Sequence, residues 1–463
     1  MRLFRYRSIK RAIDEIRDGE LYFSPREQLN DPIEGYVHVY WQGDREAWEG
    51  LFRNYVCSMS IALDYFILKA DEDIIFHKTI VDLSRFEKLP VGKHLQELGD
   101  RFLAEDEIKQ FVDLYGNRQE KVYEKELKML LHFVHTKALI LCIQQSLKAR
   151  TIPEDLGNRL LSIIRKPEKV FPIDELKNKI SEEQRKALIE TIADLFEDVQ
   201  ELHYVKLGAD NDSFLYRNSN GEKGNELTEA RQRRNWMAIT VDFPGIYTEQ
   251  LKEMIYPDSY VVCFSGNNSD SSMWGKYADN HTGVCLVYET DDANHLNLKA
   301  KDHSLHLEVK AVCYGGDVVE RNFYESLGRL TALQNKIWLS GSGGISKCYT
   351  GLFEDKWREK YWDAFETKSY RKLEAWKHED EYRIVINSLF HDYHEKENRL
   401  LKYDRTTLKG IIFGIKTSEF DKMRLVKVIQ DKFLEHSEFT FYQAEYSGES
   451  PKITVREKKL WKL

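Results

Sequence analysis

The chain has 463 residues, of which 42% are hydrophobic, and this predicts two or three globular units with real cores. Its 77 acidic and 69 basic residues give a formal net charge of −8, so no overall basic charge indicates a nucleic-acid partner. The net charge still leaves room for a local basic patch. The six cysteines form no Cys-x-x-Cys pair, which argues against a zinc site or disulfide framework and favours a reducing, cytoplasmic setting. No apolar stretch approaches the ~18 residues of a membrane span, so we expect a protein that does not enter a membrane.

The N-terminal segment predicts a β-α-β opening. "RLFRYR" and "ELYFS" have the β-branched or aromatic content of strands, and "SIKRAIDEIRDG" predicts a helix that begins after a serine cap and ends at Gly19. The following "LNDPIEG" predicts a turn, because Pro32 disfavours the helical conformation of Asp31.

The middle of the chain, residues 67–254, predicts a large α-helical insertion. Apolar residues recur every three or four positions in the segments 117–149 and 172–203. Between the second of these segments and the end of the insertion, residues 211–235 are polar and rich in Gly and Asn, which predicts a surface loop. We expect this insertion to offer a surface to a partner protein.

After Tyr256 the strand pattern returns. Six runs predict strands: "SYVVCFSG", "GVCLVYE", "LEVKAVCYGG", "YRIVINS", "LKGIIFGI" and "FTFYQAEY". A helix is expected over residues 319–339. The chain is therefore predicted to be α+β, with residues 1–66 and 255–463 forming a mixed or antiparallel β core around the insertion. "NYVCSMS" at 54–60 is similar to "SYVVCFS" at 259–265, and both predict short strands; chance similarity is favoured over a true internal repeat.

Five ordered blocks resemble one bacterial family, domain of unknown function 2971. They are "LFRYRS", "LYFSPREQLNDPIEG", "VVCFSGNNSDSSMWGKYADNHTGVCLVYE", "KLEAWKHEDEYRIVI" and "LKGIIFGI", and they cover residues 1–60 and about 256–416. The family name states no activity, so the chemistry has to be argued from the residues.

The order of polar residues also resembles the ADP-ribosyltransferase superfamily, which uses NAD as its substrate and has a core of split sheets. The resemblance implies a cationic residue on the first strand, here Arg5 or Arg7, and a serine on a later strand, here Ser24 or Ser265. The late acidic run Glu379 to Glu381 is similar to the Glu-x-Glu of transferases that modify side chains. The chain lacks the Ser-Thr-Ser triplet of that superfamily, and the helical insertion lengthens the spacing.

The segment "EDEYRIVI" concentrates acids at the entrance of a predicted strand. Side chains at i and i+2 share a face, so Glu379, Glu381 and Arg383 are expected to converge. The arginine would hold one carboxylate ionised, while a neighbouring acid or Trp376 raises the pKa of the other. Under the transferase interpretation, Glu381 stabilises the oxocarbenium-like ribose and Glu379 orients the acceptor or a water. The structural alternative is a solvated strand face with weak ion pairs.

The first strand supplies the expected cationic partner. Alternation places Leu3, Arg5 and Arg7 on one face and two aromatic residues on the other. The planar guanidinium of Arg5 or Arg7 would bind a diphosphate through two parallel hydrogen bonds. The alternative is an edge strand with solubilising arginines.

Several other residues are candidates for the same site. Ser24 and Ser265 end strands, and Ser265 is predicted to lie at a pocket edge, because "GNNSD" leads the chain out of the sheet. Trp274 and Tyr277 lie one helical turn apart and are candidates to stack on an adenine or nicotinamide ring, with core packing as the alternative. No metal site is expected, because the helix-compatible histidine pairs at 132/135 and 391/394 lack nearby acidic or cysteine partners.

Three functions are left open by the sequence. The first is an NAD-using ADP-ribosyltransferase or NAD hydrolase, with a role as a toxin or phage-defence effector by superfamily analogy. The second is a metal-dependent nuclease built from carboxylates at positions 31, 34, 379 and 381, with Lys368 near the scissile phosphate. The third is a non-catalytic nucleotide sensor or scaffold. The macromolecular acceptor of the transferase, protein or nucleic acid, is not indicated.

Overall fold

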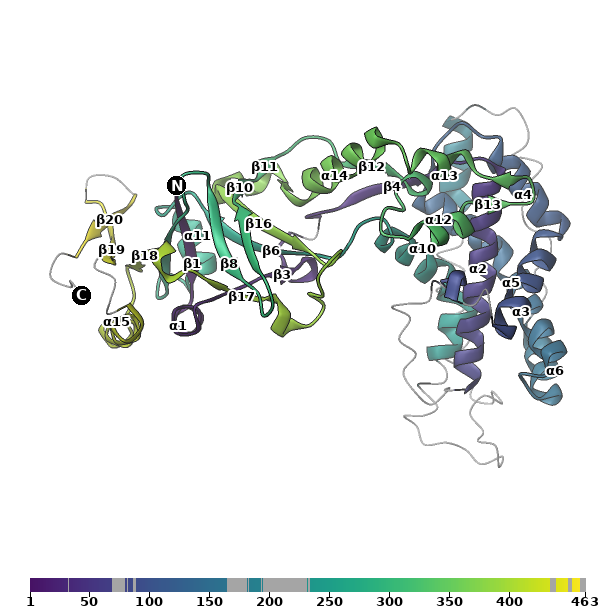
Figure 1. Ribbon diagram of the computed structural model, residues 1–463, viewed down its shortest axis with the longest axis horizontal. Helices are drawn as coiled ribbons and strands as arrows, with labels where there is room; N and C mark the ends of the chain where they lie inside the picture. The colour runs from purple at the N-terminus through teal and green to yellow at the C-terminus, as the bar shows by residue number, and fades with distance from the viewer. Residues whose placement is uncertain are drawn as a thin grey trace. The chain divides into compact units, whose positions relative to one another are not determined.

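The structure, a computed structural model, describes residues 1–31, 33–68, 80, 82–85, 89–164, 181, 183–192, 194, 231, 234–433, 439–448 and 452–458 (Figure 1). It divides into two compact units. Unit 1 comprises Met1–Val37, Pro257–Val319 and Trp362–Leu463, and unit 2 comprises His38–Tyr256 and Glu320–Tyr361. Helices and mixed sheets are both present, so the predicted α+β class is confirmed.

Unit 1 contains most of the strands. They are β1 (Arg2–Arg7), β2 (Glu20–Tyr22), β3 (Ser24–Pro25), β6 (Ser259–Ser265), β7 (Val284–Glu289), β8 (His295–Lys299), β9 (Ser304–Glu308), β10 (Lys310–Ala311), β11 (Cys313–Tyr314), β15 (Arg371–Lys372), β16 (Glu381–Asn387), β17 (Leu400–Tyr403), β18 (Leu408–Phe413), β19 (Thr440–Tyr446) and β20 (Ile453–Glu457). Its helices and helical turns are α1 (Ile9–Asp18), η1 (Arg26–Gln28), α11 (Ser271–Tyr277), η7 (Glu374–Glu379), η8 (Lys396–Arg399), η9 (Arg405–Thr407), α15 (Glu419–Phe433) and the end of α14 (Asp355–Ser369).

The main sheet of unit 1 has the order β10-β16-β6-β1-β7-β18-β19-β20, with β3 also paired to β6. The pair β18–β19 is parallel, and the other neighbours whose registers are known are antiparallel. Because β1 pairs with β6 and β7, the N-terminal strand and the late strands form one sheet.

Alternation along β1 separates the two faces of this sheet. Leu3 joins a hydrophobic cluster that includes α1, α15 and the smaller sheet β2-β17-β8-β9. Tyr6 joins a second cluster that includes α11. We call these the α1 face and the α11 face. Arg5 is paired with Leu286 and shares the α1 face, whereas Phe4 is paired with Ser265 and shares the α11 face.

Helix α1 follows the predicted limits. Ser8 precedes it with an extended backbone, and Gly19 ends it with φ of 68°, donating its N–H to the Glu15 carbonyl. This left-handed conformation is accessible to glycine without a Cβ penalty, which explains why the helix stops there. The buried stripe of α1 consists of Ala12, Glu15 and Ile16, so a carboxylate enters the core.

Unit 2 is mainly helical. Its elements are β4 (Val37–Trp41), α2 (Arg45–Leu68), η3 (Leu83–Arg85), α3 (Pro90–Leu103), α4 (Asp106–Gly116), β5 (Val122–Tyr123), α5 (Glu124–Ala149), α6 (Glu154–Ile163), the π-helical turn η5 (Ala238–Asp242), α10 (Phe243–Glu253), β12 (Val319–Asn322), η6 (Phe323–Glu325), α12 (Ala332–Trp338), β13 (Ser340–Gly341), β14 (Gly344–Ile345), α13 (Lys347–Gly351) and the start of α14. Helix α2 contacts α3, α4 and α5. The core of unit 2 is rich in aromatic residues. Within it, the Tyr55 hydroxyl hydrogen-bonds His135 at 2.8 Å, so this histidine is a packed core residue.

Some predicted elements differ from the structure. Residues 319–339 form strand β12, the turn η6 and the short helix α12 rather than one helix. "NYVCSMS" at 54–60 lies inside α2 and is not a strand. The predicted core ended at residue 66, whereas the contacts place the boundary at Val37 and assign α2 to unit 2. Of the segment 172–203, residues 183–192 are helical and most of the rest lies outside the described residues, as does most of the predicted loop at 211–235.

No helix in the described part of the chain is both long enough and apolar enough to cross a membrane.

Candidate functional site

Five charged side chains of unit 1 form a buried group that we call the charge cluster. Four of them come from β15, η7 and β16, and the fifth comes from the turn after η1. Lysine, glutamate and arginine are rarely buried to this degree unless they are paired, so their pairing decides what the group can do. The members are Glu34, Lys372, Glu379, Glu381 and Arg383, all of them buried.

The local backbone brings the two late glutamates together in an unexpected way. Strand β16 begins at Glu381, while Glu379 is the last residue of the 3-10 turn η7. Asp380 between them has φ of 44°, a left-handed conformation that redirects the chain. The predicted convergence of the two carboxylates is therefore present, but it arises from a kink before the strand rather than from strand alternation.

Lys372 lies at the centre of the charge cluster. Its Nζ donates hydrogen bonds to Glu379 Oε2 at 2.7 Å and to Glu381 Oε2 at 2.8 Å. It also lies 3.8 Å from Glu34 Oε2. One ammonium thus fixes three carboxylates, and it holds two of them through charge-assisted hydrogen bonds.

Arg383 closes the other side of the cluster. Its Nε donates to Glu381 Oε1 at 2.7 Å and one terminal nitrogen donates to Glu381 Oε2 at 3.0 Å. The other terminal nitrogen donates to the Ser369 carbonyl at 2.8 Å, and Arg383 also pairs with Glu34 Oε1. Both oxygens of Glu381 are consequently occupied by cations of this chain.

The surroundings of Glu381 and Glu34 shift the pKa values of these two carboxylates in opposite directions. Burial alone would raise the pKa of Glu381, but Arg383 and Lys372 lower it to about 2. Burial raises the pKa of Glu34 to about 7, and the nearby Arg383 offsets this only in part. Arg383 therefore keeps one acid ionised as predicted, while the acid with the raised pKa is Glu34.

This raised pKa predicts a pH-dependent stability. The usual value of 4.5 applies to the unfolded chain, so between pH 4.5 and 7 the folded protein binds more protons at Glu34 than the unfolded chain does. The contribution of Glu34 should lower the free energy of unfolding by about 3 kcal/mol as pH rises through this window and level off above it. Glu381 acts in a different window, because its stabilisation is lost only as pH falls from 4.5 towards 2.

The predicted pH dependence is checked by urea unfolding of the parent and of Glu34→Gln between pH 4.5 and 8. Hydrogen exchange of the β16 amides reports the free energy of unfolding. The decline of stability with pH should be smaller in Glu34→Gln. Parallel pH profiles for the two proteins would contradict the assignment to Glu34.

An exposed rim surrounds Glu379. The hydroxyl of Tyr277 donates to Glu379 Oε1 at 2.7 Å and accepts from Asn30 Nδ2 at 2.6 Å. Lys276 lies 3.8 Å from the same carboxylate oxygen and 3.6 Å from the Trp376 ring centroid. Glu379 is thus the buried carboxylate that connects the charge cluster to side chains reachable from solvent.

A small pocket adjoins the cluster on the Glu34 side. It encloses about 60 Å³, well below the roughly 300–1,000 Å³ of typical ligand pockets. Asp31 is buried in its wall, and its Oδ2 has no hydrogen-bond partner among the described residues. Burial lowers the pKa of Lys368, another wall residue, to about 8. The lining residues are Asp31, Ile33, Glu34, Gly35, Tyr36, Gly315, Gly316, Val318, Val319, Lys368, Arg371, Lys372 and Leu373.

The predicted arginines do not reach the charge cluster. Arg5 is buried on the α1 face, where its Nε donates to Glu15 at 3.2 Å and a terminal nitrogen donates to the Cys263 carbonyl at 2.7 Å. Arg7 donates to the same Glu15 carboxylate at 2.9 Å. Phe4, which precedes Arg5, is in register with Ser265, and Ser265 is in register with Glu381, so the alternation of β1 directs both arginines to the opposite face. Their role is to neutralise the carboxylate that α1 buries.

The predicted serines occupy structural positions. Ser265 is buried rather than at a pocket edge, and its hydroxyl donates to the Glu379 carbonyl at 2.7 Å. It contacts the backbone of the site and not its carboxylates. Ser24 pairs with Val261 of β6, four residues from Ser265, which is about 14 Å at ~3.4 Å per residue. Only Ser265 therefore belongs to the neighbourhood of the charge cluster.

The two aromatic candidates, Trp274 and Tyr277, differ in their burial. Trp274 is fully buried, its ring packs edge-on against Tyr6 at 5.1 Å, and its indole N–H donates to the Asn268 carbonyl. It is a core residue and has no face open to a ligand. Tyr277, one turn later on α11, is half-buried and contacts Glu379.

Three of the four carboxylates of the nuclease alternative, Glu34, Glu379 and Glu381, lie in the charge cluster beside Lys372. Asp31 lines the adjoining pocket, together with Glu34 and Lys368. A metal ion bound between the acids of the cluster would compete with two fixed cations for the same oxygens. The geometry thus favours a site that uses its own ammonium and guanidinium groups.

Sequence reasoning missed Lys372, the residue that organises the site. It lies on the two-residue strand β15, which pairs in parallel with β11. A lysine in "YRKLEAW" has no periodic pattern that would indicate burial. The available signal was the excess of acids in "LEAWKHEDE", which needed a nearby cation if buried.

Comparison with known proteins gives one match. The family model described as "Protein of unknown function (DUF2971)" matches residues 273–384. No curated protein and no solved structure matches the chain. The matched span is narrower than the predicted one, and it runs from α11 into β16, so it includes Tyr277, Lys372, Glu379 and Glu381. The predicted resemblance to this family is confirmed over the matched span, residues 273–384.

Proposed function

We propose that the rim above the charge cluster binds NAD and that the protein is an ADP-ribosyltransferase-like enzyme that transfers ADP-ribose or hydrolyses NAD. The observation that carries the proposal is Glu379, a buried carboxylate held by Lys372 on one oxygen and within hydrogen-bond reach of the rim on the other. A carboxylate fixed in this way can stabilise positive charge that develops on a ribose ring.

The bond changes follow from glycoside chemistry. The bond between the nicotinamide nitrogen and the ribose carbon breaks, and its electron pair leaves with nicotinamide. The ribose carbon then forms a bond to the oxygen of water or of an acceptor hydroxyl, and the proton of that oxygen passes to the solvent. Glu379 would face the ribose, and Glu381 would act through Lys372 by keeping that ammonium in place, because both of its own oxygens are already occupied.

The rim offers groups suited to a nucleotide. Tyr277 and Trp376 present aromatic rings, and Lys276 and Asn30 present a cation and an amide. The pocket beside Glu34 is too small for a dinucleotide, so we propose that NAD lies across the rim. Binding of a ring on Trp376 would displace the ammonium of Lys276 from that face.

The wider setting of the proposal follows from the sequence. We propose a cytoplasmic protein that acts as a toxin or defence effector, with an unidentified macromolecular acceptor and with the helices of unit 2 as a surface for a partner protein. These roles rest on superfamily analogy and on the absence of disulfide-like cysteine spacing.

The test is an assay of nicotinamide release from NAD by the full chain, without added metal and with cell extract as a source of acceptors. Release supports the enzyme. NAD binding without release indicates a nucleotide sensor, and metal-dependent cutting of nucleic acid without NAD turnover indicates the nuclease. Either of these last two outcomes would overturn the proposal.

A further inference from the structure

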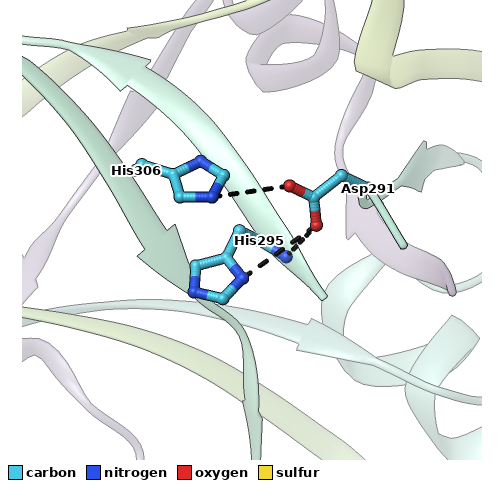
Figure 2. Close-up of side chains that lie close together, drawn as sticks. All are labelled: Asp291, His295 and His306. Atoms are coloured by element: carbon cyan, nitrogen blue, oxygen red, sulfur yellow. Dashed lines mark hydrogen bonds and ion pairs between the residues drawn. The ribbon is translucent and has the colours of Figure 1, made fainter. Parts of the chain in front are cut away.

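Three potential metal ligands gather at one end of the smaller sheet of unit 1. Asp291 follows β7, His295 begins β8 and His306 lies in β9 (Figure 2). Within the described residues, this is the group of His, Cys, Asp or Glu whose ligand atoms all lie within 4.8 Å of one another. All three side chains are exposed or half-buried, so a dissolved ion can reach them.

The turn and the hairpin bring the three together. The Asp291 carboxylate accepts backbone N–H groups of Ala293 and His295, at 3.0 Å and 2.7 Å, and Asn294 adopts φ of 64°. In the β8–β9 register, His306 is opposite Asn297, which shares a face with His295. The pairing of β8 with β9 and the hydrogen-bonded turn at Asp291 therefore hold the backbones of all three residues close together.

The geometry is close to that of a metal site. His306 Nε2 lies 3.6 Å from Asp291 Oδ2, and His295 Nδ1 lies 4.0 Å from Asp291 Oδ1 (Figure 2). Ligand atoms about 2.1 Å from a tetrahedral zinc ion are about 3.4 Å apart, so small side-chain movements would close the site. The two imidazole rings stack at 4.4 Å between centroids and 6° between planes, so they lie side by side on one surface.

Outer contacts prepare at least one histidine for coordination. His306 Nδ1 is 2.8 Å from Asn297 Oδ1, an acceptor, so Nδ1 carries the hydrogen and Nε2 keeps its lone pair towards Asp291. His295 Nδ1 also lies 2.8 Å from the Ala293 carbonyl, so metal binding through Nδ1 would replace this hydrogen bond. An amide or carbonyl acceptor behind a histidine is the usual outer partner of a metal ligand.

We propose that Asp291, His295 and His306 bind one divalent transition-metal ion, with Zn²⁺ as the best match to two imidazoles and a carboxylate. The ion joins the turn after β7 to the β8–β9 hairpin. With three protein ligands, a fourth position stays open to water or an added ligand. The sequence did not indicate this site, and the proposal is independent of the proposed NAD chemistry.

The test uses the full chain after chelator treatment, with Zn²⁺ titrated by calorimetry and Co²⁺ followed by its visible absorption. The parent should bind one ion more than His306→Ala or His295→Ala. Asn297→Ala should weaken this binding by about 10-fold, because it removes the outer partner of His306. Excess Zn²⁺ should raise the Tm of the parent more than that of His306→Ala.

The matched control is His391→Ala. His391 stacks on His303 at 3.9 Å, but among the described residues this pair belongs to no three-ligand group. His391→Ala should bind Zn²⁺ and Co²⁺ as the parent does. Equal stoichiometry in the parent and His306→Ala, or equal loss in His391→Ala, would overturn the assignment.

Discussion

Replacing Arg383 with methionine is expected to lower the free energy of unfolding of unit 1 by about 3–5 kcal/mol. Methionine keeps the apolar stem but removes the guanidinium that binds both oxygens of Glu381 and contacts Glu34. Glu381 would keep Lys372 as its cation, while Glu34, 3.8 Å from that lysine, would lose its nearest one. A buried carboxylate without a partner carries its full desolvation cost, and this explains the large size of the expected effect.

Hydrogen exchange of the β6 and β16 amides as a function of urea measures this change in unit 1 alone. The control is Arg424→Met, which removes an exposed arginine paired with Asp421 one helical turn away and should change little. Adding Glu34→Gln to Arg383→Met should recover part of the loss, because the neutral amide no longer needs the cation. A small effect of Arg383→Met, or no recovery in the double variant, would show that the charge cluster is more hydrated than the structure indicates.

The fold was predictable where buried residues recur with the period of a strand or a helix. The prediction was wrong where one short sequence is compatible with both a strand and a helix. "SYVVCFS" forms β6 in the middle of a sheet, whereas "NYVCSMS" lies inside α2. The two segments have similar apolar content, five of seven residues against four of seven, and the difference in structure comes from their surroundings. Residues 45–68 form one helix of 24 residues that packs on α3, α4 and α5, so tertiary contacts override local strand propensity.

The candidate site was predictable in its carboxylates and not in its cations. The acids in "EDEYRIVI" are adjacent in sequence, so their convergence needed only local geometry. The cation at their centre, Lys372, depends on the β11–β15 pairing, and the position of Glu34 depends on the turn after η1. Arg5 was expected at the site because of its residue type. The register of β1 against β6 places its side chain on the opposite face of the sheet from Glu381. The sequence alone does not give this strand register, so it could not show which face Arg5 occupies.

Glu379→Gln is expected to reduce nicotinamide release by ~10²–10³ relative to the parent, since the amide keeps the size of the side chain but removes its charge. The fold should persist, because glutamine still accepts from Tyr277 through its carbonyl oxygen, and Lys372 keeps Glu381. Glu381→Gln should also lose activity, but with lower stability, because Arg383 then loses the carboxylate that holds it in two places. A comparison of turnover with urea stability for the two variants separates a residue that faces the substrate from one that positions Lys372.

The matched control is Glu374→Gln, an exposed change on the same turn η7, which should leave both turnover and urea stability unchanged. If Glu379→Gln releases nicotinamide at the parent rate with its fold intact, Glu379 is not the reacting carboxylate and the proposed transferase chemistry is wrong.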